Sequence, residues 1–164
     1  MKYSRMSVED REALLAALAS MPDFVERMLG RLTSEDAMTA GSDGSLSPIE
    51  QCWHLADLER EAYAVRIHRL LHEADPVLPD FDGGKVARAR NYKARSLIDG
   101  IRAFREARSA NIHVLRSIKD SNWLRSGSQE GVGPVALCDI PSMMAQHDDA
   151  HRREIESLVR QLRN

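Results

Sequence analysis

The most informative residues of this sequence are histidines, because two of them stand one helical turn apart. His147 and His151 fall in a segment with helical periodicity, where a spacing of four residues places both imidazoles on one face. The same face carries Met143, Met144 and Leu158, so the pair interrupts an apolar stripe that should face a core. Burying two such rings without partners would cost about 1–3 kcal/mol each. Something must therefore satisfy them.

Two interpretations of this pair are open. Each ring could hydrogen-bond a tyrosine, an aspartate or a carbonyl across the core, which is the ordinary role of a buried histidine. Alternatively, the pair binds a divalent metal ion, because this spacing brings two ring nitrogens within reach of one ion. The metal interpretation needs a third ligand, and His54, near the start of another predicted helix, is the best candidate. Asp57, one turn after His54, is interpreted either as a general base or as a hydrogen-bond partner of the triad.

The remaining histidines fit such a site poorly. His68 and His72 lie about 21 and 27 Å farther along the helix than His54, at a rise of 1.5 Å per residue. With His113 they are expected to be hydrogen-bonded elsewhere or half-exposed. The sequence also lacks the Glu-x-x-His pairs of di-iron bundles, the His-Glu-x-x-His motif of zinc proteases and the Gly-x-Ser-x-Gly turn. Cys52 is expected to be buried for structural reasons, and catalytic residues remain unassigned.

Four long segments carry apolar residues at every third or fourth position, which is the helix period. The clearest helix start is Ser47-Pro48-Ile49-Glu50, a capping box with proline at the first helical position. Pro22 is predicted to kink or restart the first helix, because proline removes an internal hydrogen-bond donor. The helices are expected at about residues 7–30, 47–73, 94–119 and 141–162.

The connections are predicted from their glycines and prolines. Glycine clusters at 41–45 and 127–134 indicate loops, and residues 77–84 are expected to form an extended linker across the bundle. Val132 to Leu137 could form a brief strand, but no second segment suggests itself as its partner. The sequence therefore predicts an all-α fold, a four-helix bundle in which the long connections allow crossovers, and a single domain over residues 1–164.

Two further expectations concern where polar groups lie in this bundle. Arg102, Arg105 and Arg108 are expected to form a solvated face of the third long helix. His54 and His147 each lie about two turns inside a predicted helix start. If the two starts lie at the same end, the three imidazoles can converge there, so we expect the metal site at one end of the bundle interior.

Composition limits the classes of function. The chain has 164 residues, of which 43% are apolar, and a formal net charge of −2. This is enough apolar material for a real core, and it gives no general attraction to nucleic acid or to an anionic membrane. No apolar run approaches the roughly 20 residues that span a bilayer. The first residues contain no apolar signal core, so a cytoplasmic protein with reduced cysteines is expected.

Several short motifs together resemble one known family. They are Ser47-Pro48-x-Glu50 leading into His54-Leu55-Ala56-Asp57-x-Glu59, then Tyr92, Phe104-x-x-x-Arg108, Asn122-Trp123-Leu124-Arg125-x-Gly127 and His147-Asp148-x-x-His151. From about Leu14 to Leu162 the sequence is similar to the DinB-like (damage-inducible) superfamily of bacterial metal-binding four-helix bundles. The resemblance implies that His54, His147 and His151 hold a divalent ion such as zinc or nickel. One departure is Arg153, where many relatives have glutamine.

The resemblance also implies an activity. Some relatives are thiol transferases or isomerases that use mycothiol, bacillithiol or glutathione, so the partners would be a small-molecule thiol and an electrophile. A metal-dependent hydrolase and a non-catalytic metal-binding module, for stress response or protein association, are the alternatives. A homodimer is expected. Nucleic-acid binding is not expected, because the basic residues form only a short cluster at Arg88, Arg90, Lys93 and Arg95.

Overall fold

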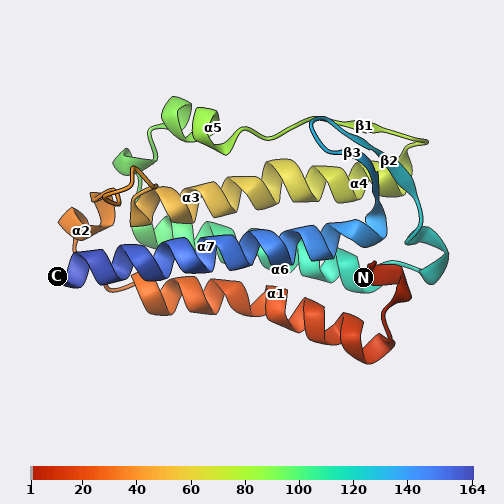
Figure 1. Ribbon diagram of the computed structural model, residues 1–164, viewed down its shortest axis with the longest axis horizontal. Helices are drawn as coiled ribbons and strands as arrows, with labels where there is room; N and C mark the ends of the chain where they lie inside the picture. Colours follow the sequence, from red (N-terminus) through yellow and green to blue (C-terminus); the bar gives the residue numbers. More distant parts are fainter. Residues whose placement is uncertain (1) are drawn as a thin grey trace.

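The computed structural model describes residues 2–164, and long antiparallel helices form its frame (Figure 1). They are α1 (Val8–Leu29), α3 (Pro48–Leu58) with its continuation through a π-helical turn η2 (Glu59–Tyr63) into α4 (Ala64–His72), α6 (Leu97–Ser117) and α7 (Ile140–Arg163). The predicted four-helix bundle is confirmed. Shorter helices, α2 (Ser34–Met38) and α5 (Gly83–Arg90), lie in the connections. Among these residues there is no helix of the length and hydropathy needed to span a bilayer.

The order of the helices around the bundle is not that of a simple up-and-down bundle. Helix α1 packs against α6 and α7, and α3 packs against the same two helices. Helices α1 and α3 therefore lie on opposite sides of the bundle, and the connection between them crosses it (Figure 1). Helices α1 and α7 run in one direction, while α3, α4 and α6 run in the other.

The helix boundaries follow local sequence signals, with two corrections. The capping box at the start of α3 is present, with Ser47 and Glu50 each bonding the backbone of the other. The predicted restart at Pro22 is wrong, because α1 continues through it as one helix. Pro22 is buried in the interior, and this packing offsets the lost hydrogen bond. The predicted start of the third long helix is also too early. Ser96 caps α6 at Leu97 because its hydroxyl accepts from the Asp99 N–H, at 3.2 Å.

A small sheet covers one end of α4, and the sequence analysis missed its pairing. Its strands are β1 (Val77–Leu78), β2 (Ser126–Gln129) and β3 (Gly133–Ala136), in the order β1-β2-β3. Strand β2 is parallel to β1 and antiparallel to β3. The predicted strand after Val132 therefore has a partner. Strand β2 has no apolar alternation, so periodicity could not reveal it, and glycines with positive φ at 131 and 133 form the hairpin turn instead.

Two apolar clusters fill the bundle, with polar side chains between them. One cluster contains Leu58, Ile112 and Met144, and the other contains Phe104 and Ile155. Between these apolar positions, α6 buries Arg108 and Asn111, and α7 buries Asp148 and His151. Cys52 and Cys138 are both buried and free, as expected for structural thiols. Burial raises the pKa of Cys52 to about 12, which keeps this thiol protonated.

The expected solvated arginine face is wrong for one of its members. Arg105 is half-exposed, but Arg108 is only 2% exposed. The reason is visible in the sequence, because Arg108 stands one turn after Phe104 and one turn before Ile112, on the apolar stripe of α6. Its guanidinium therefore points between the two clusters.

The buried charge of Arg108 is fully compensated. Its nitrogens donate to Glu59 at 2.7 and 2.9 Å and to Asp148 at 2.7 and 2.8 Å. A fifth hydrogen bond reaches the Leu18 carbonyl at 2.8 Å, and Asn111 donates to the second carboxylate oxygen of Glu59 at 2.7 Å. This group joins α1, η2, α6 and α7. It fixes their relative register, because a buried charge is tolerated only with its partners in place.

Candidate metal centre

The structure brings together the three histidines that the sequence analysis selected. His54 comes from α3, and His147 and His151 come from α7. One nitrogen from each ring lies within 4.8 Å of the others, as in a site that can hold one metal ion. The ring centres of His54 are 5.9 and 5.0 Å from those of His147 and His151. Within residues 2–164 this is the one group of three or more histidine, cysteine or acidic side chains with such geometry.

The triad converges in a different way from the one expected. The starts of α3 and α7 do not lie at the same end, because the two helices are antiparallel (Figure 1). Gln51, near the start of α3, contacts Glu154, while the Tyr63 ring, further along the chain, is 6.4 Å from the His147 ring. The imidazoles meet because α7 extends past the start of α3, so that its middle lies level with His54.

Two side chains that the sequence analysis missed orient His151. Its Nδ1 lies 2.8 Å from Oε1 of Gln51 and 3.1 Å from Oε2 of Glu154. Gln51 also donates to Glu154, at 3.0 Å. A proton on Nδ1 therefore leaves the lone pair of Nε2 free for an ion. A signal was present, because Gln51 and Glu154 each stand three residues from a predicted ligand. Glu154 is also next to Arg153, the residue that departs from the family pattern.

His54 is held from the opposite side by a glycine. A Cβ atom on Gly83, the first residue of α5, would lie 2.4 Å from Cε1 and 2.7 Å from Nδ1 of the His54 ring. Such distances are too short for real contacts, so only glycine fits against the imidazole there. Nδ1 of His54 is buried and has no hydrogen-bond partner.

The electrostatics of the triad suit a cation. Burial lowers the pKa of His54 to about 4 and that of His147 to about 3, and the neighbouring imidazoles add to both shifts. Both rings are therefore neutral at pH 7, the form that binds metals. The hydrogen bond from His151 lowers the pKa of Glu154 to about 2, so a negative charge stands beside the site. Three neutral imidazoles are donors that fit zinc or nickel.

Asp57 does not support the triad, and neither role considered for it is seen. Its carboxylate accepts hydrogen bonds from Arg90 at 2.7 Å and from the hydroxyl of Tyr92. Asp57 therefore anchors the end of α5 and the turn that follows it, and through α5 it contributes to the position of Gly83. The other three histidines, His68, His72 and His113, are exposed. Their expected exclusion from the site is consistent with this exposure.

A pocket of about 420 Å³ adjoins the triad, and His147 is part of its wall. Its other walls come from η2, α4, the linker after β1, strand β2 and α7. The lining includes Tyr63, Arg66, Phe81 and Gln129 together with apolar residues of α3 and α7. This volume is in the range of small-molecule sites. The sheet and the linker, together with the helices, therefore line an open hollow next to the candidate metal ligands.

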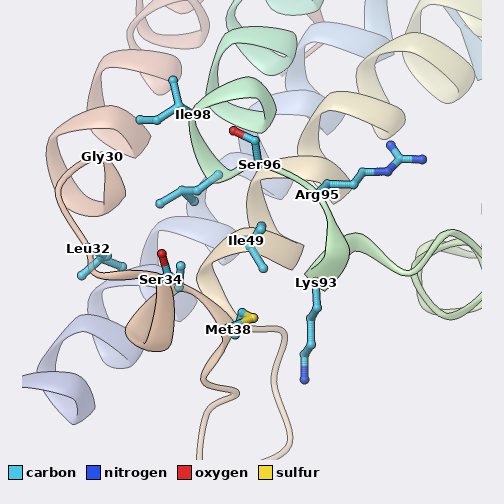
Figure 2. Close-up of a pocket in the computed structure, with 11 residues that line it drawn as sticks. Gly30, Leu32, Ser34, Met38, Ile49, Lys93, Arg95, Ser96 and Ile98 are labelled. Carbon is cyan, nitrogen blue, oxygen red and sulfur yellow. The ribbon is translucent and has the colours of Figure 1, made fainter.

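A second hollow, of about 320 Å³, lies where α1, α2, α3 and the start of α6 meet (Figure 2). It contains none of the three histidines. Its two cations are engaged: Lys93 lies 3.9 Å from Glu50, and the Arg95 guanidinium stacks 4.7 Å from the ring centre of Trp53. No buried unpartnered polar atom is found among its lining residues. The triad and its adjoining pocket are therefore the stronger candidate site.

Comparisons with known proteins identify the family and the fold of this chain. The family model of the DinB superfamily matches residues 8–155. The chain belongs to the DinB superfamily. Among solved structures, this DinB-superfamily chain is similar to YfiT from Bacillus subtilis, with a TM-score of 0.87 and 19% sequence identity over 96% of this chain and 90% of that chain. YfiT is described as a probable metal-dependent hydrolase with an unusual four-helix bundle topology. A search of curated proteins finds no match.

Proposed function

We propose that this DinB-superfamily protein is a divalent-metal-dependent enzyme that transfers a low-molecular-weight thiol to a small electrophile. His54, His147 and His151 would hold the ion, zinc or nickel, and the thiol would be bacillithiol, mycothiol or glutathione. One observation carries the proposal: three imidazole nitrogens converge within 4.8 Å beside a pocket of about 420 Å³.

The residues around the triad have distinct tasks in this function. Gln51 and Glu154 hold His151 in one ring orientation, and Gly83 lets α5 close over His54. A divalent ion held by three neutral imidazoles keeps its full charge and an exchangeable position, and it lowers the pKa of a bound thiol or water. The pocket beside His147 would place the second substrate.

The surrounding carboxylates favour a thiolate over water as the nucleophile. Asp57 is bound by Arg90 and Tyr92, and Glu154 is bound by His151 and Gln51. The lowered pKa of Glu154 also makes it a weak base. Neither of these two carboxylates is free to take a proton from an attacking water, and the other carboxylate at the pocket, Asp80, is exposed to solvent. A thiol needs less help, because its own pKa is about 8.5 in solution.

A metal-dependent hydrolase is the second candidate. It is favoured by the description of YfiT, whose fold this chain shares. In that case water would replace the thiol at the same position, and the pocket would bind an ester or amide. The same three histidines would be required, so the two candidates differ in nucleophile and not in site.

The first experiment is metal analysis of the purified protein and of single histidine variants. After chelator treatment and reloading, His54→Ala, His147→Ala and His151→Ala should lose the metal, measured by plasma mass spectrometry. His68→Ala and His72→Ala are matched controls, since both residues are exposed, and they should retain it. Equal metal content in all five variants and the wild type would contradict the site.

The second experiment separates the candidate functions. The metal-loaded protein is assayed for conjugation of monochlorobimane with each of the three thiols, and for hydrolysis of p-nitrophenyl acetate without thiol. Metal-dependent conjugation supports the transferase, and thiol-independent hydrolysis supports the hydrolase. A protein that binds metal but shows neither reaction would instead be a binding module. The expected homodimer stays a prediction, which light scattering can check.

A further inference from the structure

Buried polar atoms without a hydrogen-bond partner gather in one region of the described chain. They are Nδ1 of His54, Nε of Arg66 and Oε1 of Gln129. The first belongs to the histidine triad, and the other two belong to residues that line the adjoining pocket. An unpartnered buried polar atom costs about 1–3 kcal/mol, so two of them in the wall of one pocket, with a third in the adjoining triad, indicate that a ligand binds there.

Arg66 is the decisive member of this group. It is only 6% exposed, and among residues 2–164 no ion pair or hydrogen bond is found for its guanidinium. Its closest recorded contact is with the ring of Tyr63, whose centre is 5.7 Å from Cζ. Burial lowers the pKa of Arg66, because the charge is poorly solvated. Asp80 in the same pocket wall attracts this charge without forming a salt bridge to it, and an anionic ligand in hydrogen-bond contact would supply the missing partner.

Arg66 lies close to the histidine triad. Both lie close to the Tyr63 ring, whose centre is 5.7 Å from Arg66 Cζ and 6.4 Å from the His147 ring centre. Phe81, another lining residue, has its ring centre 6.4 Å from that of His54. One small molecule could therefore bind Arg66 with one end and present its other end to the triad.

We propose that this pocket is the subsite for the carboxylate of a small organic acid with an apolar body, and that Arg66 selects it. The inference rests on the proposed function and names the substrate class. Leu58, Phe81 and Met143 would contact the apolar body, and the Gln129 amide offers a second polar contact.

Charge balance favours a carboxylate over a phosphate. Arg66 is the one lysine or arginine in the lining, and a single carboxylate matches its single charge. Asp80 also lines the pocket, and its negative charge repels any anion there, a doubly charged phosphate about twice as strongly as a carboxylate. Asp80 attracts Arg66 but no salt bridge within 4.0 Å joins the two in the described chain, so Nε of the guanidinium stays available for a ligand.

The test uses nuclear magnetic resonance on the zinc-loaded full chain. The probe is 3-phenylpropanoate, and its neutral analogue is 3-phenylpropanamide. The carboxylate should shift the Nε–Hε signal of Arg66, assigned by its loss in Arg66→Met, and should bind about tenfold more weakly to that variant. The amide should bind both proteins equally weakly. Arg60→Met, at an exposed position on η2, is the matched control and should bind like the wild type.

Two further measurements, on an Asp80 variant and on the metal-free protein, complete the test. Asp80→Asn should bind the carboxylate more tightly, because a competing charge is removed. Equal carboxylate affinity in Arg66→Met and wild type, no binding to wild type, or stronger binding of inorganic phosphate would overturn the proposal. The titration is repeated on metal-free protein, where the Arg66 signal should still shift. The metal-free titration tests the Arg66 subsite even if the triad binds no metal. If the Arg66 signal shifts only when metal is present, the ion alone holds the carboxylate, and this result would also overturn the proposal.

Discussion

Two groups of buried polar side chains lie inside this bundle, and they differ in whether the chain itself satisfies them. Arg108 donates five hydrogen bonds to Glu59, Asp148 and the backbone. The neighbouring group around the pocket contains His54, Arg66 and Gln129, each with a buried atom that has no partner. Because unpartnered polar burial is unfavourable, the first group serves the fold, whereas the second fits the ligand site that we propose.

The two groups are connected through short stretches of chain. Asp148 follows His147 directly, so the Arg108 ion pairs also set the rotation of α7 at the triad. The π-helical turn η2 begins with Glu59, which pairs with Arg108, and ends with Tyr63, which lines the pocket. A π turn is a frequent device at functional sites, because its extra residue changes the direction of the side chains.

The largest effect is expected from breaking the satisfied group. Arg108→Met leaves Glu59 and Asp148 buried without their counter-charge, so the free energy of unfolding should fall by about 3–5 kcal/mol. Arg105→Met is the control on the same helix, since its pairs with Asp23 and Glu26 are solvent-exposed, and it should cost less than about 1 kcal/mol. Urea unfolding of the metal-free proteins measures both. Equal losses of unfolding free energy in the two variants would show that Arg108 contributes no more to the fold than an exposed arginine.

Acid should weaken the unsatisfied group next. The pKa values of His54 and His147 are lowered to about 4 and 3, so the folded metal-free protein keeps both rings neutral while the unfolded chain binds protons below about pH 6.5. The stability is therefore present above that pH and is lost as pH falls. We expect a loss of about 2 kcal/mol between pH 6.5 and 5.5. The double variant His54→Phe/His147→Leu should show a smaller loss over the same range, and an equal loss would show that other groups cause it.

A smaller effect is expected where α5 closes over the triad. Gly83→Ala would place Cβ against the His54 ring and displace it, so metal affinity should fall about tenfold. Gly84→Ala is the matched control on the next residue, because its Cβ would meet only ordinary contacts, at 3.4 and 3.6 Å. Competition with a chromogenic zinc chelator measures both affinities. A larger loss of metal affinity in Gly84→Ala than in Gly83→Ala would show that Gly83 is not the residue that packs against the His54 ring.

The smallest change in stability is expected at the unpaired arginine. Arg66→Met removes a buried charge that has no partner, so the free energy of unfolding should stay within about 1 kcal/mol of the wild type or rise. This is the opposite of Arg108→Met, although both arginines are buried to a similar degree. Urea unfolding under identical conditions compares them. A loss as large as that of Arg108→Met would mean that Arg66 serves the fold.

The sequence alone determined the helices and the three histidines. Periodicity and caps such as the Ser47–Glu50 box are local, because they depend on residues three or four positions apart. The pair His147 and His151 is visible for the same reason, since helix geometry places both on one face. The buried position of Arg108 was also local information, and it was misread only because arginine is usually exposed.

Tertiary structure decided everything that depends on how the helices are arranged. The contact of Gln51 with Glu154 joins residues about a hundred positions apart, and it follows from the antiparallel packing of α3 and α7. Strand β2 carries no apolar pattern and exists only because β1 and β3 flank it. The position of Gln129 beside Arg66 in the pocket wall depends on that sheet. Such contacts are set by packing between elements, for which no local spacing in the chain provides a signal.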